Sequence, residues 1–326
     1  MRKELVLLTG ASGTMGMAAF KELWKCRDRF ELVLLLRPSS KNRKLFSSYL
    51  QEDGLKVVWG DLLDAAVLAE ACRGIDICLH TAAIISPEAD RKPEEAEKIN
   101  HLGTRKLVAA IEAENPDHIR MVYIGSVAMY GDRLPPLHVG RTGDPIIPSV
   151  FDYYGLSKIR GELAVMESRI RHKVSLRQTF IMIPDLFSLK DPIMFHQPIN
   201  SLMEGCTERD SGRLLAACAE QAQDAGFWGK YYNIGGGASS RVSYLEFLDR
   251  VYRLLGLRYR KVMRRNWFAL KNFHMLFFDD SGELNRYLQH WEGGQDQEAF
   301  YAQVWKQFPW YLKMVSWMCR HCLLYT

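Results

Sequence analysis

Five short apolar runs recur in the first part of the chain, with stretches of helical character between them. Each run has four to six residues, is rich in Val, Leu and Ile, and shows no polar alternation. Runs of this kind form strands that are buried on both faces of a parallel sheet, and the intervening helices cover those faces. The sequence therefore predicts an α/β fold with a doubly wound parallel sheet. The predicted strands are Leu5–Thr9, Glu31–Leu36, Leu55–Trp59, Ile75–Leu79 and Met121–Ile124, and the predicted helices cover about 14–27, 62–72, 94–114 and 152–171.

A glycine-rich loop joins the first predicted strand to the first predicted helix. Its sequence is Thr9-Gly10-Ala11-Ser12-Gly13-Thr14-Met15-Gly16. Glycines at this spacing let the backbone turn tightly and approach a pyrophosphate, while the helix N-terminus supplies amide donors. Three glycines alone also occur in plain turns, but their position after a buried strand favours a dinucleotide site. The residues expected to form it are Gly10, Ser12, Gly13, Thr14, Met15 and Gly16.

The residues after the second strand bear on the choice of dinucleotide. A site for NAD is expected to have a carboxylate here that binds the ribose hydroxyls. This chain has Arg37-Pro38-Ser39-Ser40-Lys41 instead. A guanidinium, an ammonium and a hydroxyl together suit the 2′-phosphate of NADP. We therefore predict NADP(H), with Arg37, Ser39 and Lys41 around the phosphate; the alternative is that these are solvated turn residues.

Two polar side chains are predicted to share one helix face near the carboxyl edge of the sheet. Tyr154 and Lys158 are four residues apart at the start of a predicted helix, so they project together. A nearby ammonium stabilises tyrosinate and brings the phenol toward the range useful for proton transfer. Ser126 follows the strand Met121–Ile124 and is expected at the edge where ligands bind. Its hydroxyl can donate to a carbonyl oxygen while Tyr154 transfers the proton.

Six ordered motifs make residues 9–158 similar to the extended type of the short-chain dehydrogenases/reductases. This resemblance implies a Rossmann fold, hydride transfer between a nicotinamide and a carbonyl or alcohol carbon, and a homodimer formed through the helices around 100–113 and 154–167. The motifs are the glycine loop, Gly60-Asp61-Leu62, His80-Thr81-Ala82-Ala83, Asn100-x-x-Gly103-Thr104, Ser126-x-x-x-Tyr130-Gly131 and the Tyr154–Lys158 pair.

The same resemblance implies roles for individual residues. Tyr154 is the expected general acid/base, Lys158 tunes it and holds the nicotinamide ribose, and Ser126 polarises the substrate oxygen. Asp61 and Leu62 are expected at the adenine. The remaining residues expected along the cofactor are Thr81, Ala82, Ala83, Asn100 and Thr179, with Asn100 expected mainly to support the site.

Two departures separate this chain from the sugar-nucleotide members of that family. Phe180 stands where those members carry Asn, and no Arg precedes Arg209 in the segment 203–210. We predict an oxidoreductase of a small, largely apolar carbonyl compound, of the type seen in dihydroflavonol reductases and 3β-hydroxysteroid dehydrogenases. The alternatives are a nucleotide-sugar epimerase or dehydratase with bound NAD, and a non-catalytic NADP-binding regulator. The candidate substrate contacts are Ser126, Met129, Phe180, Phe187, Phe195 and His196.

The second part of the chain has a looser pattern. The segment 184–212 holds three prolines and is expected to be irregular, with a helix following. Tyr231–Ile234 is one more predicted strand, and Ser243 begins a capping box that opens a helix expected to end at Gly256. We expect an NADP-binding Rossmann domain over 1–180, and over 181–326 a substrate-binding region with one returning Rossmann strand and an aromatic, basic tail.

Composition excludes several other classes of protein. A net charge of +5 over 326 residues is too weak to indicate nucleic-acid binding. The start of the chain lacks a secretory apolar stretch, and no run of about 20 residues is free of charge, as a membrane span would be. The seven cysteines are scattered, which is typical of reduced thiols, so we expect a cytoplasmic protein. Cys319-Arg320-His321-Cys322 does not complete four ligands, and no metal is predicted. The aromatic tail is compatible with a pocket cap, a subunit contact or a membrane-surface helix, and the sequence does not favour the membrane.

Overall fold

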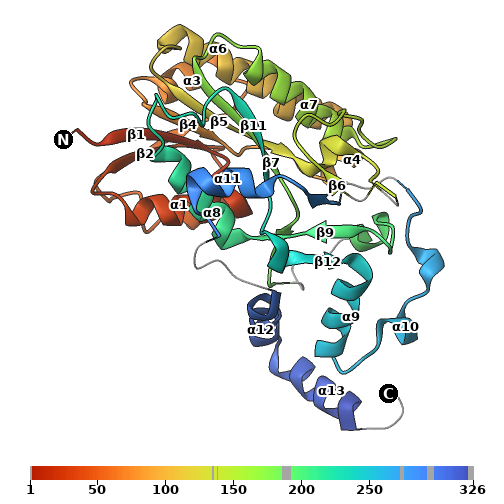
Figure 1. The fold of residues 1–326 in the computed structure, drawn as a ribbon. Coiled ribbons are helices and arrows are strands. Elements are labelled where there is room, and N and C mark those ends of the chain that lie inside the picture. The colour runs from red at the N-terminus through yellow and green to blue at the C-terminus, as the bar shows by residue number, and fades with distance from the viewer. Residues whose placement is uncertain are drawn as a thin grey trace.

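The computed structural model describes residues 2–133, 136–137, 139–185, 192–271, 275–291 and 297–321. A seven-stranded sheet lies at its centre, in the order β3-β2-β1-β4-β5-β7-β11 (Figure 1). Every neighbouring pair is parallel, which confirms the predicted doubly wound α/β fold. The strands are β1 (Glu4–Thr9), β2 (Phe30–Leu36), β3 (Leu55–Trp59), β4 (Ile77–His80), β5 (Arg120–Ser126), β7 (His172–Gln178) and β11 (Lys230–Ile234).

Two helical layers cover the sheet because its strands are apolar on both faces. Leu8 of β1 packs into a core shared with helices α1 and α8, while the adjacent Leu7 packs into a second core shared with α3, α6 and α7. The buried runs noted in the sequence thus supply both layers. The helices of these layers are α1 (Thr14–Lys25), α2 (Ser40–Phe46), α3 (Ala65–Cys72), α6 (Thr104–Glu114), α7 (Tyr153–Met166), α8 (Glu208–Ala219) and α11 (Ser281–Leu288).

The boundaries of several predicted helices change for local reasons. Helix α3 begins at Ala65, later than predicted, because the Asp64 side chain accepts a hydrogen bond from the Ala66 amide at 2.9 Å and caps it. The predicted helix over 152–171 ends at Met166, since β7 begins at His172. The predicted helix over 94–114 is composite. It consists of α5 (Pro93–Ala96), the π-helical turn η1 (Glu97–Gly103) and α6, preceded by the short α4 (Glu88–Arg91).

The second half of the chain builds a smaller body and also returns to the sheet. Helix α8 packs on α1, and α11 packs on β11. Ser243 is confirmed as the N-cap of α9, because it accepts from the Glu246 amide at 3.1 Å, and Gly256 has φ +73° beyond the helix end; the Glu246 carboxylate binds Arg250 instead of completing the predicted capping box. The elements of this body are β8 (Ile181–Met182), η4 (Pro192–His196), β9 (Leu202–Glu204), β10 (Cys206–Thr207), η5 (Ala238–Ser240), β12 (Arg241–Ser243), α9 (Tyr244–Leu254), α10 (Tyr259–Val262), η6 (Arg265–Trp267), β13 (Phe277–Phe278), α12 (Gln297–Gln307) and α13 (Trp310–His321), and β6 (Val139–Gly140) pairs with β13.

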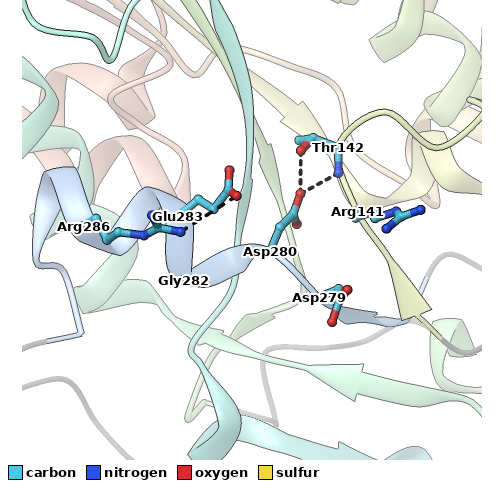
Figure 2. Close-up of a pocket in the computed structure, with 7 residues that line it drawn as sticks. All are labelled: Arg141, Thr142, Asp279, Asp280, Gly282, Glu283 and Arg286. Atoms are coloured by element: carbon cyan, nitrogen blue, oxygen red, sulfur yellow. Dashed lines mark hydrogen bonds and ion pairs between the residues drawn. The ribbon is translucent and has the colours of Figure 1, made fainter.

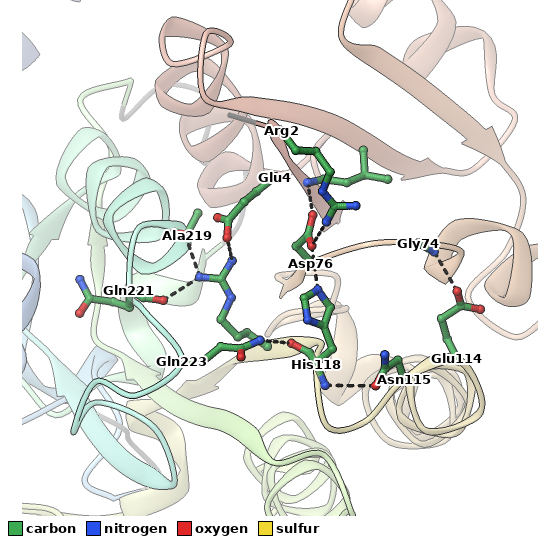
Figure 3. Close-up of polar contacts among 12 residues, drawn as sticks. Arg2, Glu4, Gly74, Asp76, Glu114, Asn115, His118, Ala219, Gln221 and Gln223 are labelled. Atoms are coloured by element: carbon green, nitrogen blue, oxygen red, sulfur yellow. Dashed lines mark hydrogen bonds and ion pairs between the residues drawn. The ribbon is translucent and has the colours of Figure 1, made fainter.

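Polar contacts fasten the amino edge of the sheet, as Figure 3 shows. Buried Asp76 accepts from the Leu5 amide at 2.8 Å and from Nε2 of His118 at 2.8 Å, and it also contacts Arg2. Arg120 binds Glu4 at 2.8 Å and the carbonyl oxygen of Gln221 at 2.6 Å. These contacts connect β1, β4, β5 and the end of α8. The candidate site lies at the opposite, carboxyl edge of the sheet.

No helix in the described ranges is long and apolar enough to cross a membrane. The cysteines in the same ranges are free thiols, and no group of three metal-binding side chains occurs among these residues.

Candidate active site

The glycine loop has the geometry that a pyrophosphate site needs. Gly10 has φ +74°, and a Cβ there would lie 2.6 Å from the Ala82 amide nitrogen, so only glycine fits. A Cβ on Gly16 would overlap the carbonyl oxygen of Gly10. At Gly13 the nearest atom to a Cβ is 3.4 Å away, and this residue caps α1 without a side-chain hydrogen bond. The loop therefore leaves an open cradle at the N-terminus of α1, the cradle that the phosphates of a dinucleotide require.

A buried hydrogen-bond chain holds the loop against the end of β4. The Ala82 amide donates to Thr9 Oγ1 at 3.3 Å, and Thr9 Oγ1 lies 2.7 Å from Nδ1 of His80. At the other side of the ring, His80 Nε2 lies 2.9 Å from Thr104 Oγ1, which donates to the carbonyl oxygen of Asn100 at 2.7 Å. Because Thr104 Oγ1 donates to Asn100, it accepts from His80, which places a proton on Nε2 and suits a neutral ring that accepts from Thr9 at Nδ1. Burial lowers the pKa of His80 to about 3, in agreement.

Asn100 has a supporting place in this arrangement. Its Oδ1 accepts from the Ile84 amide at 2.8 Å, and its Nδ2 donates to the Ile84 carbonyl oxygen at 2.8 Å and to Ser157 Oγ at 2.9 Å. Asn100 also lies within the π-helical turn η1. The Asn100 amide thus links the segment after β4, at Ile84, to helix α7.

Three cations gather at the carboxyl end of β2. Arg37 and Lys41 are exposed, and the guanidinium of Arg43 lies 4.5 Å from the centre of the Trp59 ring at the end of β3. Among the described residues, no carboxylate lies within ion-pair distance of these three cations. Ser39 caps α2 by accepting from the Asn42 amide at 3.2 Å, and its own hydrogen remains available to donate. Arg43 was not predicted, because its place depends on β3 lying beside β2.

The remaining predicted cofactor residues lie along the same edge. Asp61 follows β3 and accepts from the Leu63 amide at 2.8 Å. Leu62 is buried under η1, where a Cβ on Gly103 would lie 2.7 Å from its Cδ2 atom. Thr179 follows β7 and donates to the carbonyl oxygen of Glu204 at 2.5 Å.

Ser126 and Tyr154 meet at the end of β5, with Lys158 one helical turn further along α7. A hydrogen bond from Ser126 lowers the pKa of Tyr154, but burial is the larger effect and raises that pKa to about 12, helped by the charges of Asp152 and Asp90. The phenol of Tyr154 is therefore protonated at neutral pH unless a nearby cation stabilises the tyrosinate.

Lys158 is a buried cation. Its side chain is 4% exposed, and its Nζ lies 4.3 Å from the centre of the Tyr123 ring. Burial lowers the pKa of Lys158 to about 7, and the carboxylate of Glu162 partly opposes this shift. Because burial disfavours the charged form of Lys158, a new partner such as a hydroxyl or a tyrosinate would stabilise its ammonium.

Replacing Lys158 with Met is expected to stabilise the nucleotide-free protein. The pKa of the lysine is about 7 in the folded state and 10.5 in its ordinary environment, so stability rises with pH across that window. Below pH 7 the buried charge costs on the order of a few kcal/mol, which Lys158→Met removes. Urea unfolding should show the variant more stable below pH 7, with the difference shrinking toward pH 10. A difference that does not depend on pH would contradict the buried charge.

A buried polar network connects α7 to the central sheet. Glu162 of α7 accepts two hydrogen bonds from Arg177 of β7, at 2.8 and 3.0 Å, and one from Ser175 at 2.6 Å. Arg177 also donates to the Tyr130 hydroxyl at 2.8 Å, and Tyr130 donates to Asn233 of β11 at 2.7 Å. This network links β7, β11 and α7 to the turn Val127–Tyr130, so it holds the segment after Ser126 in place.

The predicted substrate contacts have mixed surroundings. Met129 is fully buried, and its sulfur accepts from the Ser126 amide at 3.4 Å, so it supports Ser126 from within the core. Phe180 packs edge-on against Phe247 of α9, with ring centres 6.2 Å apart. Phe195 packs against Phe268, and His196 is exposed. Phe187 lies outside the described residues.

A separate polar cavity of about 450 Å³ lies between the end of β6 and the start of α11 (Figure 2). Asp280 accepts there from the Thr142 amide at 2.6 Å and from the Thr142 hydroxyl. Its other carboxylate oxygen accepts from Asn233 at 2.8 Å, so the cavity adjoins the end of the buried network. The cavity contains none of the predicted site residues. It is lined by Arg141, Thr142, Asp279, Asp280, Gly282, Glu283 and Arg286.

Comparison with known families agrees with this geometry. The model of the NAD dependent epimerase/dehydratase family matches residues 6–197, which include the glycine loop, Ser126, Tyr154 and Lys158. The chain belongs to this family. Members depend on a nicotinamide dinucleotide, and the open cradle at Gly13 fits the phosphates of such a cofactor.

Individual relatives are more distant. D-erythronate dehydrogenase of Cupriavidus necator is 29% identical over 168 residues, and the match covers 50% of this chain and 49% of that protein, so the chain spans about half the length of this curated relative. The dTDP-glucose 4,6-dehydratase DesIV of Streptomyces venezuelae, solved with NAD, has a TM-score of 0.72 at 19% identity, over 97% of this chain and 100% of that one. MoeE5 in complex with UDP-glucuronic acid and NAD has a TM-score of 0.68 at 20% identity, over 93% and 99%. These structures share the fold of the epimerase/dehydratase family with this chain.

Proposed function

We propose that this protein is an oxidoreductase that transfers a hydride between a nicotinamide and a carbonyl or alcohol carbon. The observation that carries the proposal is the placement of Ser126 at the end of β5, with Tyr154 and the buried Lys158 one helical turn apart on α7. This pair lies at the carboxyl edge of the sheet, as does the dinucleotide cradle, where ligands of such folds bind. When bound, the nicotinamide supplies or accepts the hydride.

The residues of the chain supply the proton and orient the substrate oxygen. In the reducing direction, Ser126 donates a hydrogen bond to the carbonyl oxygen and Tyr154 gives that oxygen its proton. The charged Lys158 stabilises the tyrosinate that remains. In the oxidising direction the same tyrosinate removes the proton from the alcohol. Lys158 also holds the nicotinamide ribose in this proposal, which gives its ammonium a hydrogen-bond acceptor.

We further propose that the cofactor is NADP(H). Three cations at the end of β2, Arg37, Lys41 and Arg43, support a 2′-phosphate. In the described residues no carboxylate forms an ion pair with them, and the end of β2 has no carboxylate to bind the ribose hydroxyls. Arg37→Ala is expected to weaken NADPH about tenfold and NADH little, since a single charge-assisted contact contributes about 1.5 kcal/mol or more. Fluorescence titration with both nucleotides measures this, and Lys21→Ala on the exposed face of α1 is the control. Equal losses for both nucleotides would contradict the phosphate contact.

The substrate we propose is a small carbonyl or alcohol compound and not a nucleotide sugar. Phe180 offers no amide at the position where sugar-nucleotide members carry Asn, and its ring packs against Phe247. The match to a D-erythronate dehydrogenase also supports simple oxidation or reduction. A nucleotide-sugar epimerase or dehydratase with bound NAD is the second candidate, because DesIV and MoeE5 share the fold.

The nucleotide carried by the purified protein separates the two candidates. One sample is denatured and the released nucleotide identified, and a second is titrated with NADPH and NADH. Reversible binding with a preference for NADPH, followed by turnover in a panel of carbonyl compounds, is the expected result. Tightly held NAD⁺ that resists dialysis, with turnover of a nucleotide sugar, would overturn the proposal.

We also propose a homodimer formed through η1, α6 and α7. Leu102, Leu156 and Leu163 are exposed on these elements, and Leu156 and Leu163 are seven residues apart on one face of α7. Leu163→Glu is expected to convert the dimer to a monomer, because it places a charge in an apolar contact. Light scattering after gel filtration measures the mass, with Leu45→Glu on α2 as a matched exposed control. A wild-type monomer would contradict the interface.

A further inference from the structure

Helix α13 is apolar on both of its faces. One face packs on the protein: Leu312 joins the core around α9, and Ser316 donates to the carbonyl oxygen of Leu254 at 2.6 Å. The opposite face is open. Trp310 is 74% exposed and Trp317 is 62% exposed, with Tyr311, Met314 and Met318 beside them. Residues 310, 314, 317 and 318 lie on one side of an α-helix, so these side chains form a continuous apolar stripe.

Cations border this stripe. Lys313 and Arg320 lie on the flank of α13 that faces Trp305: Nζ of Lys313 is 5.9 Å and the guanidinium carbon of Arg320 is 5.6 Å from the centre of the Trp305 ring. The twelve residues of α13 include no Asp or Glu. The aromatic stripe is therefore accompanied by positive charge alone on its own helix.

A second basic segment begins at the same place. Gly256, just after α9, lies against α13: a Cβ there would be 2.9 Å from Cys319 Cβ and 3.1 Å from Arg320 Cγ. The segment 258–271 follows and contains no acidic residue. Its cations are all exposed, as are Trp267 and Leu270. These cations are Arg258, Arg260, Lys261, Arg264, Arg265 and Lys271.

We propose that the open face of α13, together with segment 258–271, docks on an anionic phospholipid surface. Aromatic and Met side chains enter the interface between headgroups and acyl chains, and the flanking cations bind the phosphates and carboxylates of the headgroups. Figure 1 shows α13 at the end of the molecule away from the central sheet, so a flat surface can reach it. The helix lies on the bilayer and does not span it, consistent with its twelve residues.

Charge favours this occupant over a second copy of the chain. A symmetric contact through the same face would bring the cations of both copies together. An anionic bilayer offers an apolar interior for the exposed aromatic and Met side chains and negative charge for the bordering cations. An acidic protein partner would need both in one patch, and it is tested as an alternative outcome.

Co-sedimentation of the full chain with vesicles tests the proposal. Binding is expected to vesicles of phosphatidylcholine mixed with phosphatidylserine, to be at least tenfold weaker with phosphatidylcholine alone, and to fall as salt rises from about 0.1 M. A blue shift of Trp fluorescence should accompany binding. No binding to the mixed vesicles, or equal binding to both kinds at all salt concentrations, would overturn the proposal.

Paired variants assign the effect to this face. Trp310→Ser with Trp317→Ser, and separately Lys313→Gln with Arg320→Gln, should each weaken binding about tenfold or more. Lys21→Gln with Arg73→Gln, which removes exposed cations elsewhere, is the matched control and should leave binding unchanged. Circular dichroism and the melting temperature establish that the variants fold. Self-association that the Trp variants abolish, in a protein that ignores vesicles, would overturn the proposal in favour of a contact between copies.

Discussion

Tyr154→Phe is expected to lower the turnover rate by about 10²–10⁴-fold while leaving nucleotide binding unchanged. The phenol hydroxyl is the only atom group removed. It carries the proton in the proposed mechanism, and the side chain of Ser126 lowers its pKa. The ring stays in place, so the neighbouring Lys158 and the glycine loop keep their positions. Steady-state kinetics with the carbonyl substrate from the panel, and fluorescence titration with NADPH, measure the two quantities separately.

Tyr153 provides a matched control for this variant. It is the adjacent residue in α7, it is exposed, and it has no lysine four residues further along. Tyr153→Phe removes the same hydroxyl from the neighbouring position and should leave turnover unchanged. Full activity of Tyr154→Phe would remove the acid/base assignment, and loss of activity in Tyr153→Phe would transfer that role to the neighbouring phenol.

Arg177→Met is expected to lower the free energy of unfolding by about 3–5 kcal/mol, the usual effect of removing one partner of a buried ion pair. The guanidinium is 5% exposed and binds both carboxylate oxygens of Glu162. Without it, Glu162 keeps only the hydroxyl of Ser175, and Tyr130 loses a donor. The carboxylate of Glu162 would then be buried without the positive charge that compensates it. Urea unfolding at neutral pH measures the loss.

The double variant Glu162→Gln, Arg177→Met is the control for this prediction. It removes both charges, so it should be more stable than Arg177→Met alone. Glu162→Gln has a second consequence: the carboxylate raises the pKa of Lys158, so its removal should shift the alkaline limb of the pH–rate profile to lower pH. A double variant less stable than the single one would contradict the account of a buried pair.

The elements that depend on local sequence were predicted well. The glycine loop, the N-cap at Ser243 and the parallel strands all follow from short-range rules, because turn geometry, helix capping and burial on both faces act within a few residues. The π-helical turn around Asn100 was missed; the Asn100 side chain bonds there to Ile84 and Ser157, which are 16 and 57 residues away and belong to no local pattern. Met129 was expected at the substrate, and its complete burial depends on the packing of neighbouring elements.

Glu204 is a further residue that sequence reasoning missed. It is fully buried, and its carboxylate accepts from Arg241 at 2.9 Å, Ser281 at 2.6 Å and two backbone amides. These partners come from the turn at Gly237 and from β12, β13 and α11, between 33 and 77 residues away along the chain. No local pattern predicts such a meeting.

By itself, the sequence determined the class of fold and the glycine loop, and it supplied the proposed reactive side chains, because these depend on residue type and spacing along one segment. Tertiary structure alone decided which charges are buried and which faces remain open. It placed Arg43 over Trp59, enclosed Lys158 so that its pKa falls to about 7, and left the aromatic side of α13 exposed. Burial and electrostatic partners arise from elements far apart in the chain, so they exist only once those elements pack together.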